Sequence, residues 1–354
     1  MLGGDYWRHE SSSVSRFVFS APSIDLFNPV HTGIPSGALD TPDFVAQNEQ
    51  SEDWYGFYVQ DQVKLPFNVH LLAGFRYDDA SQSNNSSKSD DSAVTPRFGL
   101  LWQPIPTLSL YGNYVEGFGA SNVFSLTASG TAPPAETAQQ WEIGAKTELF
   151  DGRLSATLAW FDITKQNIAN PDPDPVRALA GFSVTTGEVR NRGLELDVSG
   201  EIWPDVRAIA SYAYIDSEIT KDRQAIFNDD FTEVIGFNDG NQGNRLFGVP
   251  RHGGSFWVTY EPQTLGWRGL KLGAGVVARG QQEGDNENTF QLPGYALVNL
   301  MAGYGWKVGP SKVSVQLNVD NLLDKEYFDA GGNSVFAAIP GAPRTFLGSV
   351  RVEW

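Results

Sequence analysis

The sequence predicts an all-β fold, a transmembrane antiparallel up-and-down β-barrel of about 14 strands with short periplasmic turns and long extracellular loops. Three observations predict it. Segments of about ten residues alternate polar and apolar side chains, the period of a strand with one wet and one apolar face. Short and long connections alternate along the chain. The last strand ends on an aromatic residue, Trp354.

The predicted strands cover residues 2–9, 53–64, 68–79, 94–103, 107–117, 137–149, 152–165, 189–203, 206–217, 250–261, 269–280, 293–306, 312–321 and 343–354. Apolar and charged residues alternate clearly in several of them. The apolar series is Trp141, Ile143, Ala145 and Leu149 in one strand and Leu194, Leu196, Val198 and Ile202 in another. The charged series, predicted to face a wet lumen, is Glu142, Lys146, Glu148, Glu195, Asp197 and Glu201.

The closing strand shows the same division into two faces. One face carries Phe346, Gly348, Val350, Val352 and Trp354, and the other carries Thr345, Leu347, Ser349, Arg351 and Glu353. An apolar face opposite a largely polar one suits a wall between lipid and a polar lumen. The terminal aromatic resembles the signal by which outer-membrane barrels are handed to the barrel assembly machinery.

The connections fall into two sets. Short turns are predicted at 64–68, 103–107, 150–153, 203–205, 262–267 and 307–311, and longer loops at 10–52, 80–92, 118–136, 166–188, 218–249, 281–292 and 322–342. Five tryptophans lie at or beside the short-turn end, namely Trp102, Trp203, Trp267, Trp306 and Trp354. Amphipathic rings collect where lipid headgroups meet water, so this distribution favours a membrane barrel over a soluble β-sheet protein.

The composition excludes several classes of protein. The 354 residues contain no run of about 18 apolar residues, the length that a transmembrane helix needs. The absence of cysteine excludes disulfides and thiolate metal sites, and the net charge of −17 argues against nucleic acid as a partner. Residues 1–8 read as a strand and lack the features of a signal peptide, so a mature form or a fragment is expected, and the start inside a strand favours a fragment.

Catalysis finds little support in the sequence. The four histidines, His9, His31, His70 and His252, are scattered without the spacing of a metal site or of a base beside a nucleophile. Residues 285–288 (Asp-Asn-Glu-Asn) offer oxygen ligands for a hard cation, although a solvated loop is the favoured interpretation. We therefore expect no enzyme activity and no metal ligands of the protein's own.

A series of short motifs runs through nearly the whole chain in a characteristic order. They are Gly56–Val63, Ala73–Asp78, Thr95–Leu100, Leu110–Val115, Pro134–Lys146, Gly187–Glu195, Val249–His252, Leu292–Tyr295, Asn318–Asp324 and Pro343–Phe346. In this order the motifs resemble those of the TonB-dependent receptors, specifically the ferrichrome-type siderophore receptors.

The resemblance implies a place in the bacterial outer membrane and a role in the uptake of a ferric siderophore. The siderophore carries its own iron, so no cofactor is expected. The family has an N-terminal plug inside a barrel of about 22 strands. Residues 1–354 contain no plug and no energy-coupling box, so they are interpreted as one partial barrel domain, with TonB acting only through the absent plug.

Two functions remain open at this point. The first is the siderophore receptor barrel, with ferric siderophore, outer-membrane lipid and the assembly machinery as partners. The alternative is a plugless 14-strand pore that passes small solutes passively, since a smaller closed barrel is geometrically allowed. A soluble β enzyme is a remote third possibility that lacks any convergent acid, base or nucleophile.

Three aromatic residues in long loops are candidates for ligand binding. A ferric siderophore needs aromatic rings and hydrogen-bond donors around a wet vestibule. The first long loop offers Phe17 and Phe19, and the last offers Phe336. The resemblance suggests that these rings contact the ligand. The competing interpretation is that they pack within their own loops.

Overall fold

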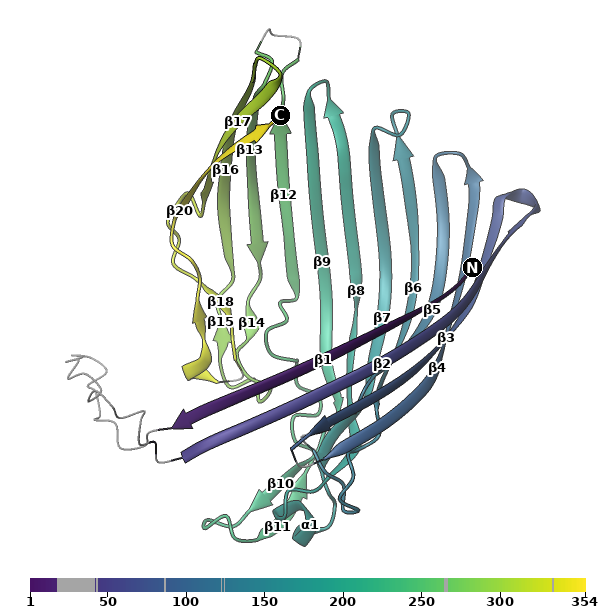
Figure 1. Ribbon diagram of the computed structural model, residues 1–354, viewed down its shortest axis with the longest axis vertical. Helices are drawn as coiled ribbons and strands as arrows, with labels where there is room; N and C mark the ends of the chain where they lie inside the picture. The colour runs from purple at the N-terminus through teal and green to yellow at the C-terminus, as the bar shows by residue number, and fades with distance from the viewer. Residues whose placement is uncertain are drawn as a thin grey trace, which may run out of the picture.

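A computed structural model describes residues 1–17, 42, 44–85, 87–121, 123, 125–263, 267–332 and 334–354. Fourteen strands form one antiparallel sheet in which each pairs with its neighbours in chain order (Figure 1). The sheet curves strongly, and strands β1 to β4 cross in front of the strands that follow them in this view. The predicted all-β barrel architecture is confirmed, and each of the fourteen predicted strands is present.

The first seven strands of the sheet are β1 (Leu2–Phe17), β2 (Phe44–Leu65), β3 (Val69–Asn84), β4 (Lys88–Ile105), β5 (Leu108–Gly119), β6 (Glu136–Leu149) and β7 (Leu154–Pro171). The others are β8 (Ser183–Trp203), β9 (Val206–Lys221), β12 (His252–Tyr260), β13 (Leu270–Arg279), β16 (Tyr295–Val308), β17 (Ser311–Asp320) and β20 (Thr345–Glu353).

The long connections carry small elements of their own. These are helix α1 (Pro175–Leu179), the hairpins β10 (Gln224–Phe227) with β11 (Val234–Asn238), β14 (Gln282–Glu283) with β15 (Gln291–Leu292) and β18 (Phe328–Ala330) with β19 (Ile339–Pro340), and the 3-10 turns η1 (Pro66–Asn68) and η2 (Val335–Ala337). Among the described residues, no helix is long and apolar enough to cross a membrane.

Several strands extend further on the long-loop side than predicted. The first loop was expected to cover residues 10–52, but β1 continues to Phe17 and β2 already begins at Phe44. The paired extension is rich in polar residues, with Ser11 opposite Gln50 and Ser13 opposite Asn48. A strand that has left the hydrocarbon has no lipid on either side, so the alternation that marks a membrane strand ends before the strand does.

The short turns gather at one end of the sheet, at the top of Figure 1. They are tight because several residues adopt left-handed backbone conformations there. Asp151 and Gly152 have φ values of 57° and 79° in the β6–β7 turn, and Gly309 has a φ of 59° in the β16–β17 turn. Such conformations suit two strands that reverse direction within a few residues. The five tryptophans predicted at this end lie there, each within three residues of a strand end.

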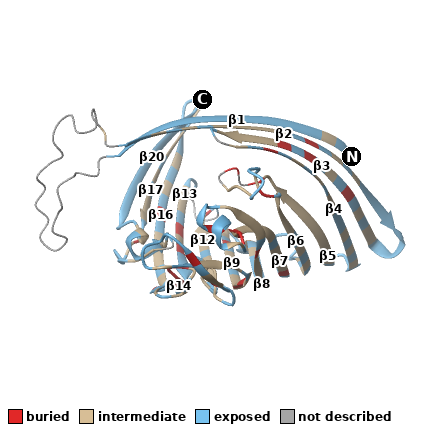
Figure 2. Ribbon diagram, turned by 90° about the horizontal axis from the view of Figure 1, so that it is seen from below, coloured by how far each residue is buried: buried red, intermediate tan, exposed pale blue. Residues whose placement is uncertain are grey.

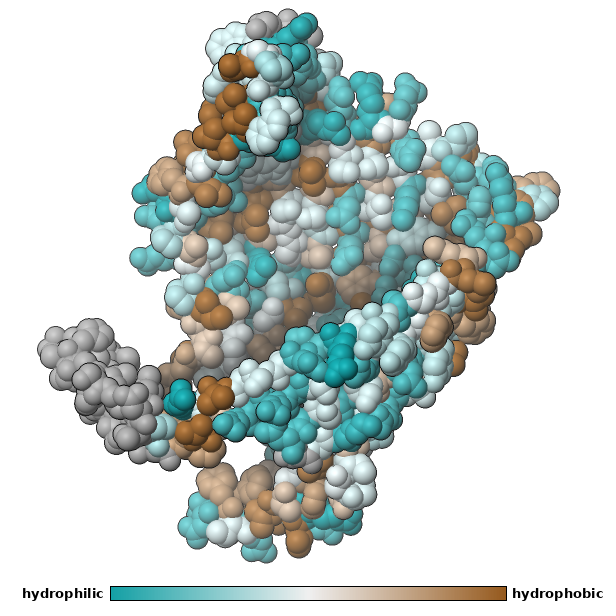
Figure 3. All heavy atoms as spheres, viewed as in Figure 1, coloured by the Kyte–Doolittle hydropathy of each residue, from teal (hydrophilic) through white to brown (hydrophobic). Residues whose placement is uncertain are grey.

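The two faces of the sheet differ in polarity as predicted. In the register of β17 and β20, Val315 lies opposite Val350 and Gln316 lies opposite Ser349. Val350 is 71% exposed although it is apolar. Exposed apolar residues recur on this outer face in other strands, including Trp141, Ile143, Leu194 and Leu196. Figure 3 looks into the concave side, where hydrophilic residues are spread over the inner wall. The outer face therefore has the apolar character expected of a surface that meets lipid.

The sheet is a single layer, so few residues are buried, and the described buried ones lie mainly in the loops and on the inner face (Figure 2). Its two edges are β1 and β20. In the described registers β1 pairs only with β2, and β20 pairs only with β17. The closed 14-strand barrel that the sequence allowed is thus not formed by backbone pairing in the part of the chain that the structure describes. Peptide groups left unpaired in hydrocarbon cost several kcal/mol each, so both edges need backbone partners in the membrane.

Candidate functional site

Three aromatic rings form a cluster on the inner face of the sheet, where polar side chains predominate. Trp7 on β1 lies opposite Trp54 on β2, and their rings are stacked with centroids 5.8 Å apart and an interplanar angle of 17°. Phe118 on β5 meets Trp54 edge-on, at 5.4 Å and 62°. We call these three residues the luminal aromatic cluster. Large rings on the wet side of a barrel wall gain nothing from lipid, which points to contact with a ligand or with other protein.

A divergence of two strands brings the cluster together. The described pairing of β4 with β5 ends at Arg97 and Val115, and beyond this point β5 continues beside β6 alone. Phe118 lies in this diverging segment, within reach of Trp54 on β2. Residue 118 was predicted to begin a long loop; the structure instead extends β5 to Gly119 and gives Phe118 a fixed position.

A charged group supports the central ring of the cluster. The guanidinium of Arg76 on β3 binds Asp5 on β1, with a nitrogen–oxygen distance of 2.8 Å, and Asp78, also at 2.8 Å. The indole nitrogen of Trp54 donates a hydrogen bond of 2.7 Å to Asp78, which is only 4% exposed. One buried carboxylate is therefore satisfied by both a guanidinium and an indole, and the orientation of Trp54 is fixed.

The aromatic rings and the charges share one cavity of about 380 Å³. Arg97 and Glu116 complete its wall, and Arg97 reaches Gln60 at 3.5 Å. Flat rings can stack on the organic shell of a metal chelate, while guanidinium and carboxylate groups bind its polar edges. The described residues include no cluster of three or more His, Asp or Glu side chains that could hold a metal ion.

A second part of the inner face is acidic. The hydroxyl of Tyr111 donates a 2.6 Å hydrogen bond to Glu142, and the ammonium of Lys146 lies 5.0 Å from the centre of the Tyr111 ring. Glu195 on β8 faces the same side of the sheet. It lies opposite Ala159 on β7, and Ala159 lies opposite Gly144 on β6. The Tyr111 ring covers Gly144, so all of these residues share the inner face. The charged face predicted for β6 and β8 therefore lines the lumen.

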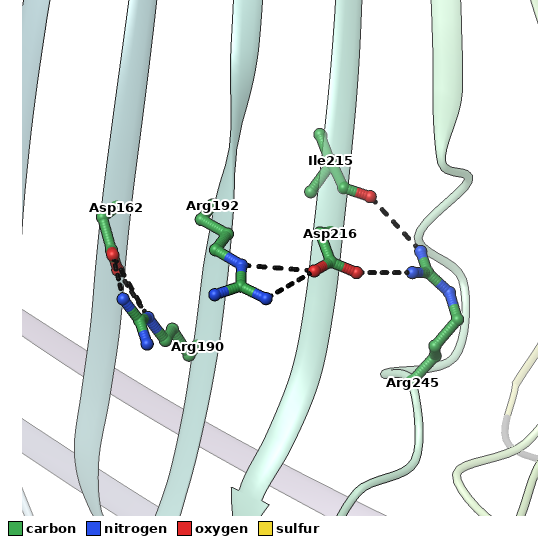
Figure 4. Close-up of polar contacts among 6 residues, drawn as sticks. All are labelled: Asp162, Arg190, Arg192, Ile215, Asp216 and Arg245. Atoms are coloured by element: carbon green, nitrogen blue, oxygen red, sulfur yellow. Dashed lines mark hydrogen bonds and ion pairs between the residues drawn. The ribbon is translucent and has the colours of Figure 1, made fainter.

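The outer face carries a network of ion pairs at the long-loop side of the membrane band (Figure 4). Arg190 on β8 pairs with Asp162 on β7, and Arg192 pairs with Asp216 on β9 at 3.1 Å. Asp216 also binds Arg245 of the following loop, at 3.3 Å. Figure 4 views β7, β8 and β9 from the side opposite to that in Figure 1. This network ties three strands and a loop together where the lipid-facing rows of side chains end.

The structure separates the three ligand-binding candidates taken from the sequence. Phe17 lies at the end of β1 rather than in a loop, with its ring 5.8 Å from that of Phe44. Phe336 lies in the turn η2 and is 98% exposed. Phe19 falls outside the described residues. Neither Phe17 nor Phe336 belongs to the luminal aromatic cluster, and the role of all three residues in binding remains a prediction.

The sequence contained a signal for the cluster that its interpretation missed. Trp7 and Trp54 occupy positions of the polar series in their strands. Trp7 shares a face of β1 with Asp5, and Trp54 shares a face of β2 with Gly56. An aromatic ring at a position that faces the lumen is an exception to the pattern, and such exceptions mark candidate sites. The contact of Phe118 with Trp54 carried no comparable signal, because it depends on where β4 and β5 diverge.

A curved antiparallel sheet with an apolar outer face, a polar inner face, short turns at one end and long loops at the other defines an outer-membrane β-barrel protein. Comparison with known families agrees with this class. The model of the TonB-dependent receptor-like β-barrel matches residues 2–322, and the chain belongs to this family. It is therefore a protein of the bacterial outer membrane.

Several curated relatives are similar over nearly the whole chain. The metal-pseudopaline receptor of Pseudomonas aeruginosa is 32% identical over 100% of this chain and 48% of its own length. The ferrioxamine B receptor of Salmonella typhimurium is 30% identical over 99% of this chain and 47% of its own length. The ferrichrome outer membrane transporter/phage receptor of Escherichia coli is 30% identical over 92% of this chain and 42% of its own length. The chain spans about half the length of these relatives.

Solved structures confirm the fold. A siderophore receptor of Acinetobacter baumannii superposes with a TM-score of 0.77 at 23% identity, covering 99% of this chain and 52% of that protein. The ferric preacinetobactin receptor of the same organism gives a TM-score of 0.75 at 24% identity, with coverage of 99% and 51%. At these identities the likeness concerns the fold alone.

Proposed function

We propose that this chain forms the barrel wall of a receptor that takes up ferric siderophores across the outer membrane. The observation that supports this most is the luminal aromatic cluster, with its supporting Arg76 and Asp78, on the wet face of the wall. Relatives named as receptors for ferrioxamine B and for ferrichrome are similar over most of the chain. They give no support to the alternative of a passive pore.

The proposal includes the partners and the source of energy. The substrate is a ferric siderophore of the hydroxamate type, which carries the iron, so the protein needs no cofactor of its own. Uptake draws its energy from the inner membrane through TonB. The barrel assembly machinery inserts the wall into lipid. The protein is a transport receptor and carries out no chemical reaction on its ligand.

Replacement of Trp54 by alanine is expected to weaken siderophore binding about tenfold or more, because a central aromatic anchor contributes most of the affinity of such a site. The measurement is a titration of the purified chain with ferrioxamine B, followed by quenching of tryptophan fluorescence. Wild type should show saturable quenching.

Trp203→Ala is the matched control for this titration. Trp203 is an exposed tryptophan beside the β8–β9 turn, remote from the cluster in sequence and register. Its loss should leave the affinity unchanged. Equal affinities of wild type and Trp54→Ala would remove the cluster from the ligand site, and the absence of saturable binding by wild type would contradict the proposed function of this wall.

A further inference from the structure

A second cavity, of about 400 Å³, lies where β12 begins and β13 ends, on the long-loop side of the sheet. Two guanidinium groups, Arg245 and Arg251, line it together with His252, Gln281, Glu283 and Gln291. We call this cavity the arginine cleft. It shares no lining residue with the cavity of the luminal aromatic cluster. Apart from Gly280, the residues that line it have polar or charged side chains, which suits a ligand with polar groups.

The cleft has a rigid wall because two loops hold Arg245 by its backbone. The Arg245 nitrogen donates to the side-chain oxygen of Asn288 at 2.9 Å, and the Asn288 side-chain amide donates to the Arg245 carbonyl, also at 2.9 Å. Asn244 next to it donates to the carbonyl of Asn286 at 2.9 Å. Reciprocal bonds of this kind fix the backbone of Arg245 before any ligand arrives, which reduces the entropy cost of binding.

The guanidinium of Arg245 is largely enclosed, with its side chain 15% exposed. Three oxygens accept from it, namely Oδ1 of Asp216 at 3.3 Å and the carbonyls of Ile215 at 3.3 Å and Val249 at 3.4 Å. A guanidinium has five N–H groups, so donors remain for another acceptor. Burial, and then the like charge of Arg251, lower the pKa of Arg245. An added negative charge in the cleft would favour the charged form of Arg245 and offset the like charge of Arg251.

The charges around the cleft do not balance. Asp216 is shared between Arg245 and Arg192, whose Nη2 lies 3.1 Å from it. Glu283 accepts a 3.0 Å hydrogen bond from Gln291 and is the one carboxylate that lines the cleft itself. The side chain of Arg251 is exposed and has no recorded ion pair within the described ranges. Among the side chains that line the cleft itself there are two guanidiniums, Arg245 and Arg251, and one carboxylate, Glu283, in a protein whose net charge is −17.

We propose that the arginine cleft binds an oxyanion, a carboxylate carried by the ligand. Guanidinium groups bind carboxylates through paired N–H···O bonds, and the amides of Gln281 and Gln291 add neutral donors at the rim. Arg251 directly precedes β12, and its carbonyl accepts a 2.9 Å hydrogen bond from the Ile215 nitrogen of β9, so the cleft lies at the long-loop end of the sheet. The inference rests on the proposed function only for the source of the carboxylate: the receptor would favour a ferric hydroxamate chelate that also carries a free carboxylate over one that carries none.

The probe for this proposal is sodium citrate, titrated calorimetrically into the purified chain at low ionic strength. Arg251→Gln is expected to weaken citrate binding about tenfold, the loss of one charge-assisted contact. Arg251→Lys keeps the charge and should recover part of the affinity. Arg268→Gln is the matched control, since it removes an exposed arginine at the short-turn end, and it should leave citrate binding unchanged.

A second arm separates the carboxylate from a lipid phosphate, which has the same oxyanion chemistry. The chain is placed in vesicles that contain spin-labelled phosphatidic acid. The measurement is the spin-label signal of immobilised lipid. If this signal requires Arg251 and persists when citrate is added, the cleft binds lipid and the proposal is overturned. Absence of citrate binding by wild type, or equal losses in Arg251→Gln and Arg268→Gln, would also overturn it. Because no siderophore is present, these outcomes are independent of the ferrioxamine B titration.

Discussion

Introduction of arginine at Val315 is expected to destabilise the inserted protein by about 2–4 kcal/mol, provided that the site lies near the bilayer midplane. Val315 lies on the outer face of β17, opposite Tyr304 on β16 and Val350 on β20. A guanidinium there must enter hydrocarbon without a partner. Folding titrations into lipid vesicles measure the cost, and Leu196→Arg on β8 should behave in the same way because Leu196 shares the outer face.

Neighbouring positions on the inner face supply the controls. Gln316→Arg and Glu195→Arg place the same charge on the wet side of the same two strands, and each should cost far less than the change at the adjacent apolar position. Equal costs on both faces would mean that the sheet does not separate lipid from water.

Gly193→Ala is expected to destabilise the wall by about 1–3 kcal/mol. A Cβ atom at Gly193 would lie 1.9 Å from the backbone oxygen of Tyr214 and 3.0 Å from the ring of Phe161. The oxygen belongs to the β9 backbone, so it cannot move away without disturbing the ladder between β8 and β9. Urea unfolding from detergent or lipid measures the change.

Gly112→Ala is the control for this packing effect. A Cβ at Gly112 would meet its nearest neighbour, a side-chain carbon of Ile143, at 3.5 Å, an ordinary contact. The change should stay within about 0.5 kcal/mol of wild type. If both alanine variants were equally stable, the close approach of β8 and β9 at Gly193 would be refuted.

The number and order of the strands could be predicted because lipid acts on every one of them. Each membrane strand must alternate apolar and polar side chains, so segments such as 312–321 and 343–354 are recognisable one by one. The extent of β1 and β2 beyond residues 9 and 53 could not be predicted in this way. Outside the hydrocarbon both faces are wet, and the pairing of Ser11 with Gln50 leaves no periodic signal.

The candidate site was less predictable than the fold. Trp7 and Trp54 are visible in the sequence as rings on a polar face, whereas Phe17, Phe19 and Phe336 were predicted to bind the ligand because they were expected in long loops. The contact of Phe118 with Trp54 depends on the point where β4 and β5 diverge, and local alternation does not encode that point. Arg245 and Arg251 likewise line one cleft because Asn288, from another loop, holds the backbone of Arg245. The positions of these residues along the sequence do not predict that contact.

Cysteine scanning along β17 tests the central claim, that this sheet is a membrane wall with one face in lipid and the other in water. The chain has no cysteine of its own, so each introduced thiol is unique. In vesicles, fluorophores at positions 313, 315 and 317 should be quenched by nitroxide lipids, and thiols at 314, 316 and 318 should react with a charged, membrane-impermeant reagent. A period of two between the two responses is the predicted result. Equal reactivity and equal quenching at all six positions would contradict the account.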